Sequence, residues 1–270
     1  MEQNIELKDL VKEKYSEIVK DDDCGCSCGS GTVRNKLETN FSLADDYVNL
    51  DGYTPDADYS LGCGVPTKHA EIKPGDTVLD LGSGAGNDVF IVQKIVGEFG
   101  SVIGLDFTQE MIDKANQNKQ KLGLDNVSFK LGDIEDIPLE QDHIDVLISN
   151  CVLNLVPDKQ KAFQEMYRVL KPGAHFCVSD IVSEGAIPEE LKKSAELYAG
   201  CVAGAIPKEE YLAFVKQAGF ENLQIRKERS IDIPEETAKQ YLSESEWTAW
   251  NTEGLGLFSI TLYAEKPLKD

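Results

Sequence analysis

A regular alternation of short apolar runs and helix-length segments dominates the middle of this 270-residue chain. Five runs rich in β-branched or other apolar residues are each followed by a segment that could form a helix. They are Thr77–Gly82, Ser101–Phe107, Val127–Asp133, Ile144–Val152 and His175–Val182. Parallel strands need such crossovers, and the crossover helices cover both faces of the sheet. The order therefore predicts a doubly wound α/β fold.

The two ends of the chain show weaker patterns. Residues 1–20 carry apolar side chains at helical intervals, which predicts an amphipathic helix that caps the domain. Helical patterns near Glu189–Ala199 and Lys208–Ala218 follow the fifth run. Two last strands, Asn222–Ile231 and Leu257–Pro267, are close enough to pair as an antiparallel edge.

Charge excludes some classes of partner. The chain has 27 basic and 48 acidic residues, a net charge of −21. Such a surplus repels nucleic acid and anionic membrane surfaces. No apolar run approaches the roughly 20 residues that span a bilayer, and the first 20 residues mix charges throughout rather than showing the basic patch and apolar stretch of a leader. We therefore expect a cytoplasmic protein, and its seven cysteines favour thiols held for chemistry or metal binding over structural disulfides.

A glycine-rich loop follows the first predicted strand. In DLGSGAGND, Gly82, Gly84 and Gly86 permit a tight turn and a close approach of backbone N–H groups to a ligand at a helix N-terminus. Asp106 ends the second strand, where a carboxylate can accept from ribose hydroxyls, and Asp133 follows the third. An acidic crevice suits a sulfonium nucleoside better than a pyrophosphate dinucleotide.

These motifs resemble those of class I S-adenosylmethionine-dependent methyltransferases. The similar segments are DLGSGAGND, GLDF and GDIED, and the likeness extends from Pro74 to Pro267. The resemblance implies a Rossmann-like, doubly wound, seven-stranded methyltransferase sheet with an N-terminal cap and small C-terminal additions. It also implies a set of residues that bind S-adenosylmethionine: Asp80, Gly82, Ser83, Gly84, Gly86, Asp106, Met111, Gly132, Asp133, Ile134, Glu135 and Asn150.

Three cysteines suggest the acceptor. Cys151 follows the fourth strand, at the edge where open α/β sheets bind ligands, and Cys63 and Cys201 lie in glycine-flanked turns. Their contexts, LGCGVP, SNCVLNL and GCVAGA, are similar to those of the arsenite methyltransferase family. That family implies that Cys151 and Cys201 hold trivalent arsenic, with Cys63 a further ligand or the redox partner. Soft thiolates select such soft centres.

The expected chemistry needs no general base. The arsenic lone pair attacks the sulfonium methyl group directly, so alignment matters most, and we assign no role to His69, His143 or His175. Thiols regenerate trivalent arsenic by forming a disulfide, for which Cys26 or Cys28 would pair with Cys63, and thioredoxin or glutathione would reset it. Alternatively, Cys24, Cys26 and Cys28 are spare thiols of a solvated loop, or they chelate an adventitious metal ion. Cys177, among apolar neighbours, is expected to be a buried hydrophobe.

We divide the chain into three regions. Residues 1–66 would form the cap and cysteine-bearing loops, 67–185 the S-adenosylmethionine-binding core, and 186–270 a substrate-binding segment with the closing antiparallel strands. Two other functions stay open. One is a methyltransferase acting on carbon or oxygen of a small metabolite with incidental cysteines, and the other is a thiol-based metalloid binder without turnover.

Overall fold

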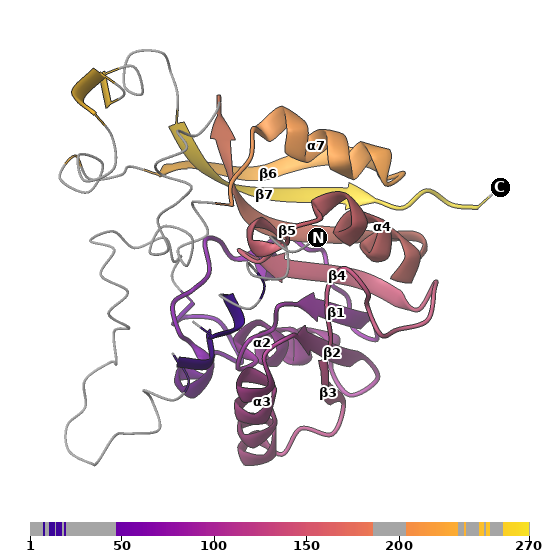
Figure 1. The fold of residues 1–270 in the computed structure, drawn as a ribbon. Helices are drawn as coiled ribbons and strands as arrows, with labels where there is room; N and C mark the ends of the chain where they lie inside the picture. Colours follow the sequence, from indigo (N-terminus) through magenta and orange to yellow (C-terminus); the bar gives the residue numbers. More distant parts are fainter. Residues whose placement is uncertain are drawn as a thin grey trace, which may run out of the picture.

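One seven-stranded sheet forms the centre of the molecule (Figure 1). The computed structural model describes residues 47–185, 204–231 and 256–269, together with 8, 11–13, 15–17, 19, 235, 243–245, 247 and 248. The strand order is β3-β2-β1-β4-β5-β7-β6. The strands are β1 (Thr77–Leu81), β2 (Ser101–Asp106), β3 (Val127–Leu131), β4 (Ile144–Asn150), β5 (Leu170–Glu184), β6 (Glu221–Ile231) and β7 (Gly256–Glu265). The predicted doubly wound fold is therefore confirmed.

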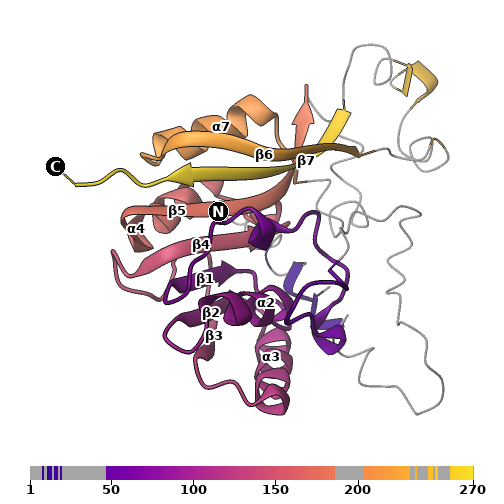
Figure 2. The same cartoon turned by 180° about the vertical axis from the view of Figure 1, so that it is seen from behind.

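The first five strands run parallel, and β7 runs antiparallel between β5 and β6. The predicted antiparallel pairing of the last two strands is thus correct, but of these two strands only β6 lies at an edge of the sheet. The fifth strand begins at Leu170, five residues before the predicted His175, because Leu170 pairs with Ile144 across a bulge. Figure 2 shows the same order of strands from behind.

Helices cover both faces of this sheet. They are α2 (Asn87–Val96), α3 (Gln109–Leu122), α4 (Lys159–Val169) and α7 (Lys208–Gln217), with short 3₁₀ helices η1 (Pro55–Ala57), η2 (Pro66–Lys68) and η3 (Leu153–Leu155). The predicted helix near Glu189–Ala199 lies outside the described residues.

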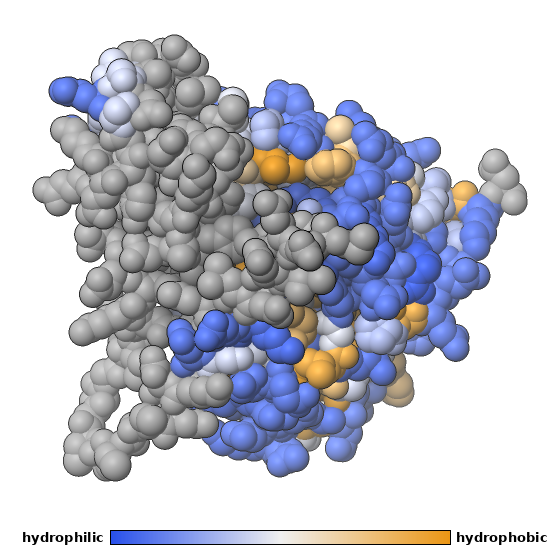
Figure 3. Space-filling model, viewed as in Figure 1, coloured by the Kyte–Doolittle hydropathy of each residue, from blue (hydrophilic) through white to orange (hydrophobic). Residues whose placement is uncertain are grey.

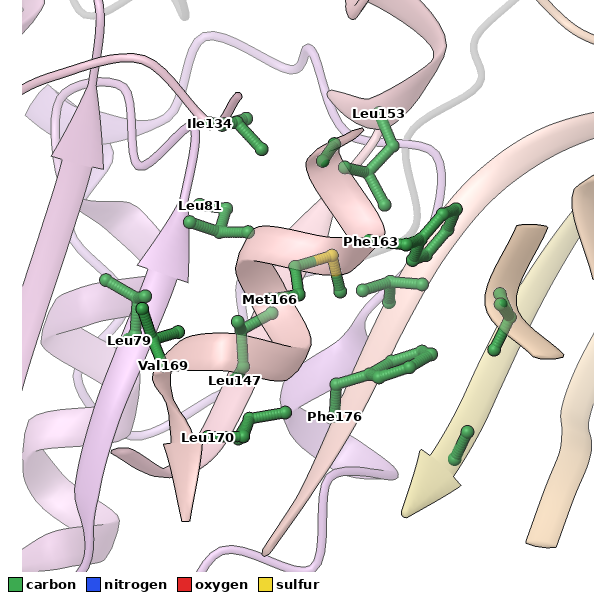
Figure 4. Close-up of a cluster of buried hydrophobic side chains, with 14 of the residues drawn as sticks. Leu79, Leu81, Ile134, Leu147, Leu153, Phe163, Met166, Val169, Leu170 and Phe176 are labelled. Carbon is green, nitrogen blue, oxygen red and sulfur yellow. The ribbon is translucent and has the colours of Figure 1, made fainter. Parts of the chain in front are cut away.

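Alternate residues of each strand point to opposite faces of the sheet, so the hydrophobic core forms two main clusters, one on each face. On β1, Leu79 and Leu81 pack with side chains of α4 and α7, whereas Val78 packs with those of α2 and α3. In Figure 4, Phe163 and Met166 of α4 lie over the sheet residues of the first cluster. This two-sided burial explains why the core strands are nearly continuous apolar runs.

The N-terminal helix contacts the body of the protein. Residues 8, 11–13, 15–17 and 19 are helical, Val11 and Val19 are buried, and Val19 joins the cluster beneath α2. Lys8 forms ion pairs with Asp133 at 2.6 Å and Glu135 at 2.7 Å. The described residues of this segment therefore agree with a docked amphipathic helix.

The visible surface of the described part is mostly hydrophilic, with small apolar patches (Figure 3), as the charged composition predicts. Within the described ranges, we find no helix that is both long enough and apolar enough to span a membrane.

Candidate active site

The loop between β1 and α2 depends on glycine at two positions. Gly82 has φ +70°, and its backbone N–H donates to the Leu105 carbonyl at 2.7 Å. A methyl group on Gly82 would occupy the space of the Val152 side chain. Gly86 has φ +100°, and a methyl group there would lie 2.8 Å from the Phe90 and Phe129 rings. The loop is therefore held close to its neighbours and exposes backbone at the start of α2.

A cavity opens beside this loop at the carboxyl ends of the strands, where an open α/β sheet binds ligands. It holds about 1140 Å³ of space continuous with solvent. Most of the predicted cofactor residues line it: Asp80, Gly82, Ser83, Gly84, Asp106, Met111, Gly132, Asp133, Ile134 and Asn150. The structure therefore brings these ten residues together.

The two other predicted cofactor residues do not line the cavity. Gly86 packs against the Phe90 and Phe129 rings. Glu135 accepts from Lys8 Nζ at 2.7 Å and from the Asp158 backbone N–H at 2.9 Å. Its carboxylate thus ties the N-terminal helix and the start of α4 to the loop after β3.

Carboxylates make this cavity acidic. Burial, together with the charges of Asp88 and Asp106, raises the pKa of Asp80 well above its usual range. Burial also raises the pKa of Asp106, although the N–H groups of Thr108 and Gly84 donate to its carboxylate at 2.8 and 3.0 Å and oppose the rise. A cationic ligand would relieve both effects.

Two side-chain oxygen atoms at this site are buried without a hydrogen bond to the described residues. They are Ser83 Oγ and Asp88 Oδ1. Buried polar groups are normally hydrogen-bonded, so both atoms are available to a ligand. With the glycine loop and Asp106, they fit a nucleoside that carries an amino-acid chain.

Cys151 lies at the wall of the cavity. It follows β4 directly, is 3% exposed and has φ +61°, a left-handed conformation uncommon for a residue other than glycine. Its backbone N–H donates to the Ser179 carbonyl at 2.7 Å, which holds this conformation. Cys151, whose thiol is predicted to face the acceptor side, is therefore one of the residues that line the cavity.

Cys63 is fully buried and does not line the cavity. Its backbone N–H donates to Asn150 Oδ1 at 3.1 Å, and its carbonyl accepts from Ser259 Oγ at 2.6 Å. Cys24, Cys26, Cys28 and Cys201 lie outside the described residues. Within the described ranges, no three His, Cys, Asp or Glu side chains are grouped to hold a metal ion.

Sequence reasoning missed a buried pair near the two thiols. The Tyr211 hydroxyl donates to Asp180 Oδ2 at 3.1 Å, and both residues are almost completely buried. Burial raises the pKa of Asp180 to about 7. Burial, the charge of Asp180 and the hydrogen bond to Asp180 raise the pKa of Tyr211 well above its usual value, and the charges of Cys63 and Cys151 add to the rise. A carboxylate inside the apolar run HFCVSDIV was the available signal.

A second missed group joins Tyr47 and Asp88 to Asn150. The Tyr47 hydroxyl lies 3.0 Å from Asp88 Oδ2 and accepts from Asn150 Nδ2 at 2.5 Å. Burial raises the pKa of Asp88 to about 6, and the hydrogen bonds from Tyr47 and Asn150 limit the rise. Tyr47 had no sequence signal, because its contacts are 41 and 103 residues away.

The side chains set aside by the sequence lie elsewhere. Cys177 is fully buried in the cluster beneath α2, and burial raises the pKa of its thiol to about 12, which confirms the expected buried hydrophobe. None of the three histidines, all of them described, lines the cavity. His175 Nε2 lies 2.7 Å from the Ala70 carbonyl oxygen at the opposite edge of the sheet.

Comparisons with known proteins point in one direction. A family model described as a methyltransferase domain matches residues 72–236. An arsenite methyltransferase of Halobacterium salinarum is 38% identical over 98% of this chain and 68% of its own length. The human arsenite methyltransferase is 37% identical over 59% of this chain, which spans only 44% of that protein.

The solved structures agree. The crystal structure of an arsenic(III) S-adenosylmethionine methyltransferase from Chlamydomonas reinhardtii superposes with a TM-score of 0.63 at 32% identity. The match covers 75% of this chain and 66% of the Chlamydomonas chain.

Proposed function

Because this chain belongs to the arsenite methyltransferase family, within the class I methyltransferases, we propose that it transfers the methyl group of S-adenosylmethionine to trivalent arsenic held by cysteine thiolates. The observation that carries the proposal is that Cys151 lines an acidic cavity built around a glycine loop. A methyl acceptor bound there would lie beside the cofactor's site.

Different residues of the cavity would bind different parts of the cofactor. Asp106 would accept from the ribose hydroxyls, Asp80 and the Gly82–Gly84 backbone would hold the methionine part, and Ile134 would contact the adenine. Ser83 Oγ, buried without a partner among the described residues, would donate to an acceptor on the ligand. When bound, S-adenosylmethionine supplies an electrophilic methyl group next to a sulfonium charge, which the carboxylates stabilise.

Arsenic would be bound as substrate by Cys63, Cys151 and Cys201. Three thiols exchange with the three hydroxyls of arsenous acid, and each exchange forms an As–S bond and releases one water. The pyramidal arsenic keeps its lone pair, so no residue has to remove a proton from the acceptor. Of the two described ligands Cys151 lines the cavity, so arsenic bound to it would lie beside the cofactor's site, with the lone pair on the side opposite the three sulfur atoms. Alignment can supply up to ~7–11 kcal/mol of such a barrier.

Reduction completes the proposed cycle. Formation of the As–C bond leaves arsenic pentavalent, and two thiols return two electrons to it as they join in a disulfide. Cys26 or Cys28 together with Cys63 would form that disulfide, and thioredoxin or glutathione would reduce it. A cytoplasmic location suits these thiols, because its reducing pool keeps them active.

The test follows arsenic species directly. Purified protein is incubated with S-adenosylmethionine, a thiol reductant and arsenite, and the products are separated by chromatography with elemental detection. We expect methylated arsenicals from the wild type and none from Cys151→Ser or Cys201→Ser, while their affinity for S-adenosylmethionine is unchanged.

Cys177→Ala is the matched control, since that thiol is buried on the α2 side of the sheet and should leave methylation intact. Normal turnover by the Cys151→Ser and Cys201→Ser variants would show that these thiols are not arsenic ligands.

A further inference from the structure

The turn that carries Cys63 is tied to the end of β4 by one side chain. Asn150 Oδ1 accepts from the backbone N–H groups of Cys63 at 3.1 Å and Gly64 at 3.3 Å, and Asn150 Nδ2 donates to the Gly64 carbonyl at 2.9 Å. A single amide thus satisfies two donors and one acceptor of this turn. Asn150 is 87 residues from Cys63 in sequence, so this contact attaches a distant loop to the sheet.

The turn also fits tightly against the strand ends. A methyl group on Gly62 would lie 2.5 Å from Asn150 Nδ2, and one on Gly64 would lie 2.5 Å from Ser179 Oγ of β5. Ser259 Oγ of β7 donates to the Cys63 carbonyl at 2.6 Å. Contacts from β4, β5 and β7 therefore leave the Cys63 backbone little freedom.

Cys151 is held by the same strand ends. It follows Asn150 directly, and its backbone N–H donates to the carbonyl of Ser179. Asn150 thus binds the Cys63 backbone, and Ser179 binds the backbone of the residue that directly follows Asn150.

Two further residues brace the Asn150 amide. Tyr47, 6% exposed, places its hydroxyl 2.5 Å from Asn150 Nδ2 and 3.0 Å from both the Gly64 carbonyl oxygen and Asp88 Oδ2. Asp88 lies in the first turn of α2, directly after the glycine loop. The network therefore connects the cofactor loop to the Cys63 turn.

We propose that Asn150 is a positioning residue that sets where the Cys63 thiol lies relative to the Cys151 thiol, with Tyr47 and Asp88 holding its amide in place. Asn150 lines the cavity, but its polar atoms are already engaged by the Cys63 turn, Tyr47 and Asp88, so its main effect is on the thiols. The role of Asn150 in arsenic binding rests on the proposed function. Its role in positioning the two thiols does not depend on that function.

The first experiment uses Cd²⁺ alone as a probe. In the full chain, Cys24, Cys26, Cys28 and Cys201 are replaced by Ser and Cys177 by Ala, which leaves Cys63 and Cys151. Cd²⁺ is titrated while thiolate-to-metal charge-transfer absorption is followed, a signal that carboxylates do not produce. Asn150→Ala should lower the Cd²⁺ affinity by at least about tenfold, as loss of a group that orients metal ligands does.

Asn118→Ala is the matched control. Asn118 is equally an amide, is 1% exposed, and donates to the Ala85 carbonyl at 3.2 Å on the other side of the cofactor loop. Its loss should change the Cd²⁺ affinity by less than about threefold. Tyr47→Phe removes one hydroxyl from the network and should lower the affinity in the same direction if Asn150→Ala fails to fold.

The second experiment uses the otherwise unaltered chain. Asn150→Ala should raise the KM for arsenite by about tenfold or more, and by a clearly larger factor than it raises the Kd for S-adenosylmethionine. The inference is overturned if the two-thiol parent shows no charge-transfer band, if Asn150→Ala and Tyr47→Phe bind Cd²⁺ as the parent does, or if only the affinity for S-adenosylmethionine falls. A lower Cd²⁺ affinity in a chain whose parent never methylates arsenic would reject the proposed function and keep the role of Asn150.

Discussion

Replacing Asp180 by Asn should change how the stability of this protein depends on pH. Asp180 is 1% exposed, accepts from the Tyr211 hydroxyl and the Ile181 N–H, and has its pKa raised by burial from 3.8 to about 7. Between these two values the folded state holds a proton that the unfolded state has released. Stability from this group is therefore fully present below about pH 4 and is lost as the pH rises to about 7.

The magnitude follows from that gap. At ~1.36 kcal/mol per pH unit, the full loss approaches about 4 kcal/mol, of which about 2.7 kcal/mol falls between pH 5 and pH 8. The neutral amide introduced by Asp180→Asn cannot titrate, so this variant should gain stability relative to the wild type as the pH rises from 5 to 8. Asp80, Asp88 and Asp106 also have raised pKa values, but they are present in both proteins and their contribution cancels in the difference.

The assay is urea unfolding of the wild type and the variant at pH 5 and pH 8, with the free energy of unfolding extrapolated to water. Asp125→Asn, at an exposed position, controls for the loss of one negative charge. If the difference between Asp180→Asn and wild type is the same at both pH values, Asp180 is not a buried, raised-pKa carboxyl and the reasoning fails.

Two further predictions concern the loop and the core. Gly82→Ala should weaken binding of S-adenosylmethionine by at least about tenfold in calorimetry, because the added methyl group meets Val152 at φ +70°, whereas Gly75→Ala, at φ +93° with open space around it, should leave the affinity nearly unchanged. If both variants lost the same affinity for S-adenosylmethionine, the loss would come from backbone strain alone and not from the contact with Val152. Lys266→Met should destabilise the protein by about 3 kcal/mol in urea unfolding, because Lys266 Nζ is buried and donates to Asp142 and to the Tyr167 and Leu170 carbonyls. Lys269→Met, which removes the exposed partner of the same carboxylate, should cost less than about 1 kcal/mol, and a similar cost for both would contradict the importance of burial.

Local patterns were enough to predict the sheet. The five parallel strands were predicted from apolar runs, because a strand buried on both faces needs apolar side chains at every position. Their ends were less certain: β1 stops at Leu81 and β4 at Asn150, since the following residues already turn toward the cavity. The bulged start of β5 at Leu170 depends on its partner Ile144, which no local pattern specifies.

The sequence also predicted most of the residues that surround the glycine loop. The glycine loop and Asp106 occupy positions that the alternation itself defines, whereas Asp80 was assigned through the family resemblance, and all three segments line the cavity. Glu135 lies in the same motif but outside the cavity, because Lys8 and Asp158 engage its carboxylate.

What the sequence determined by itself is the alternation of the core strands and helices and the edge at which ligands bind, since both follow from periodicity and spacing along the chain. Only the tertiary structure decided which side chains surround the thiols. Asn150 meets the Cys63 turn and Tyr211 meets Asp180 across 87 and 31 residues. Such contacts arise from the packing of whole elements, whose relative placement depends on every layer of the core at once.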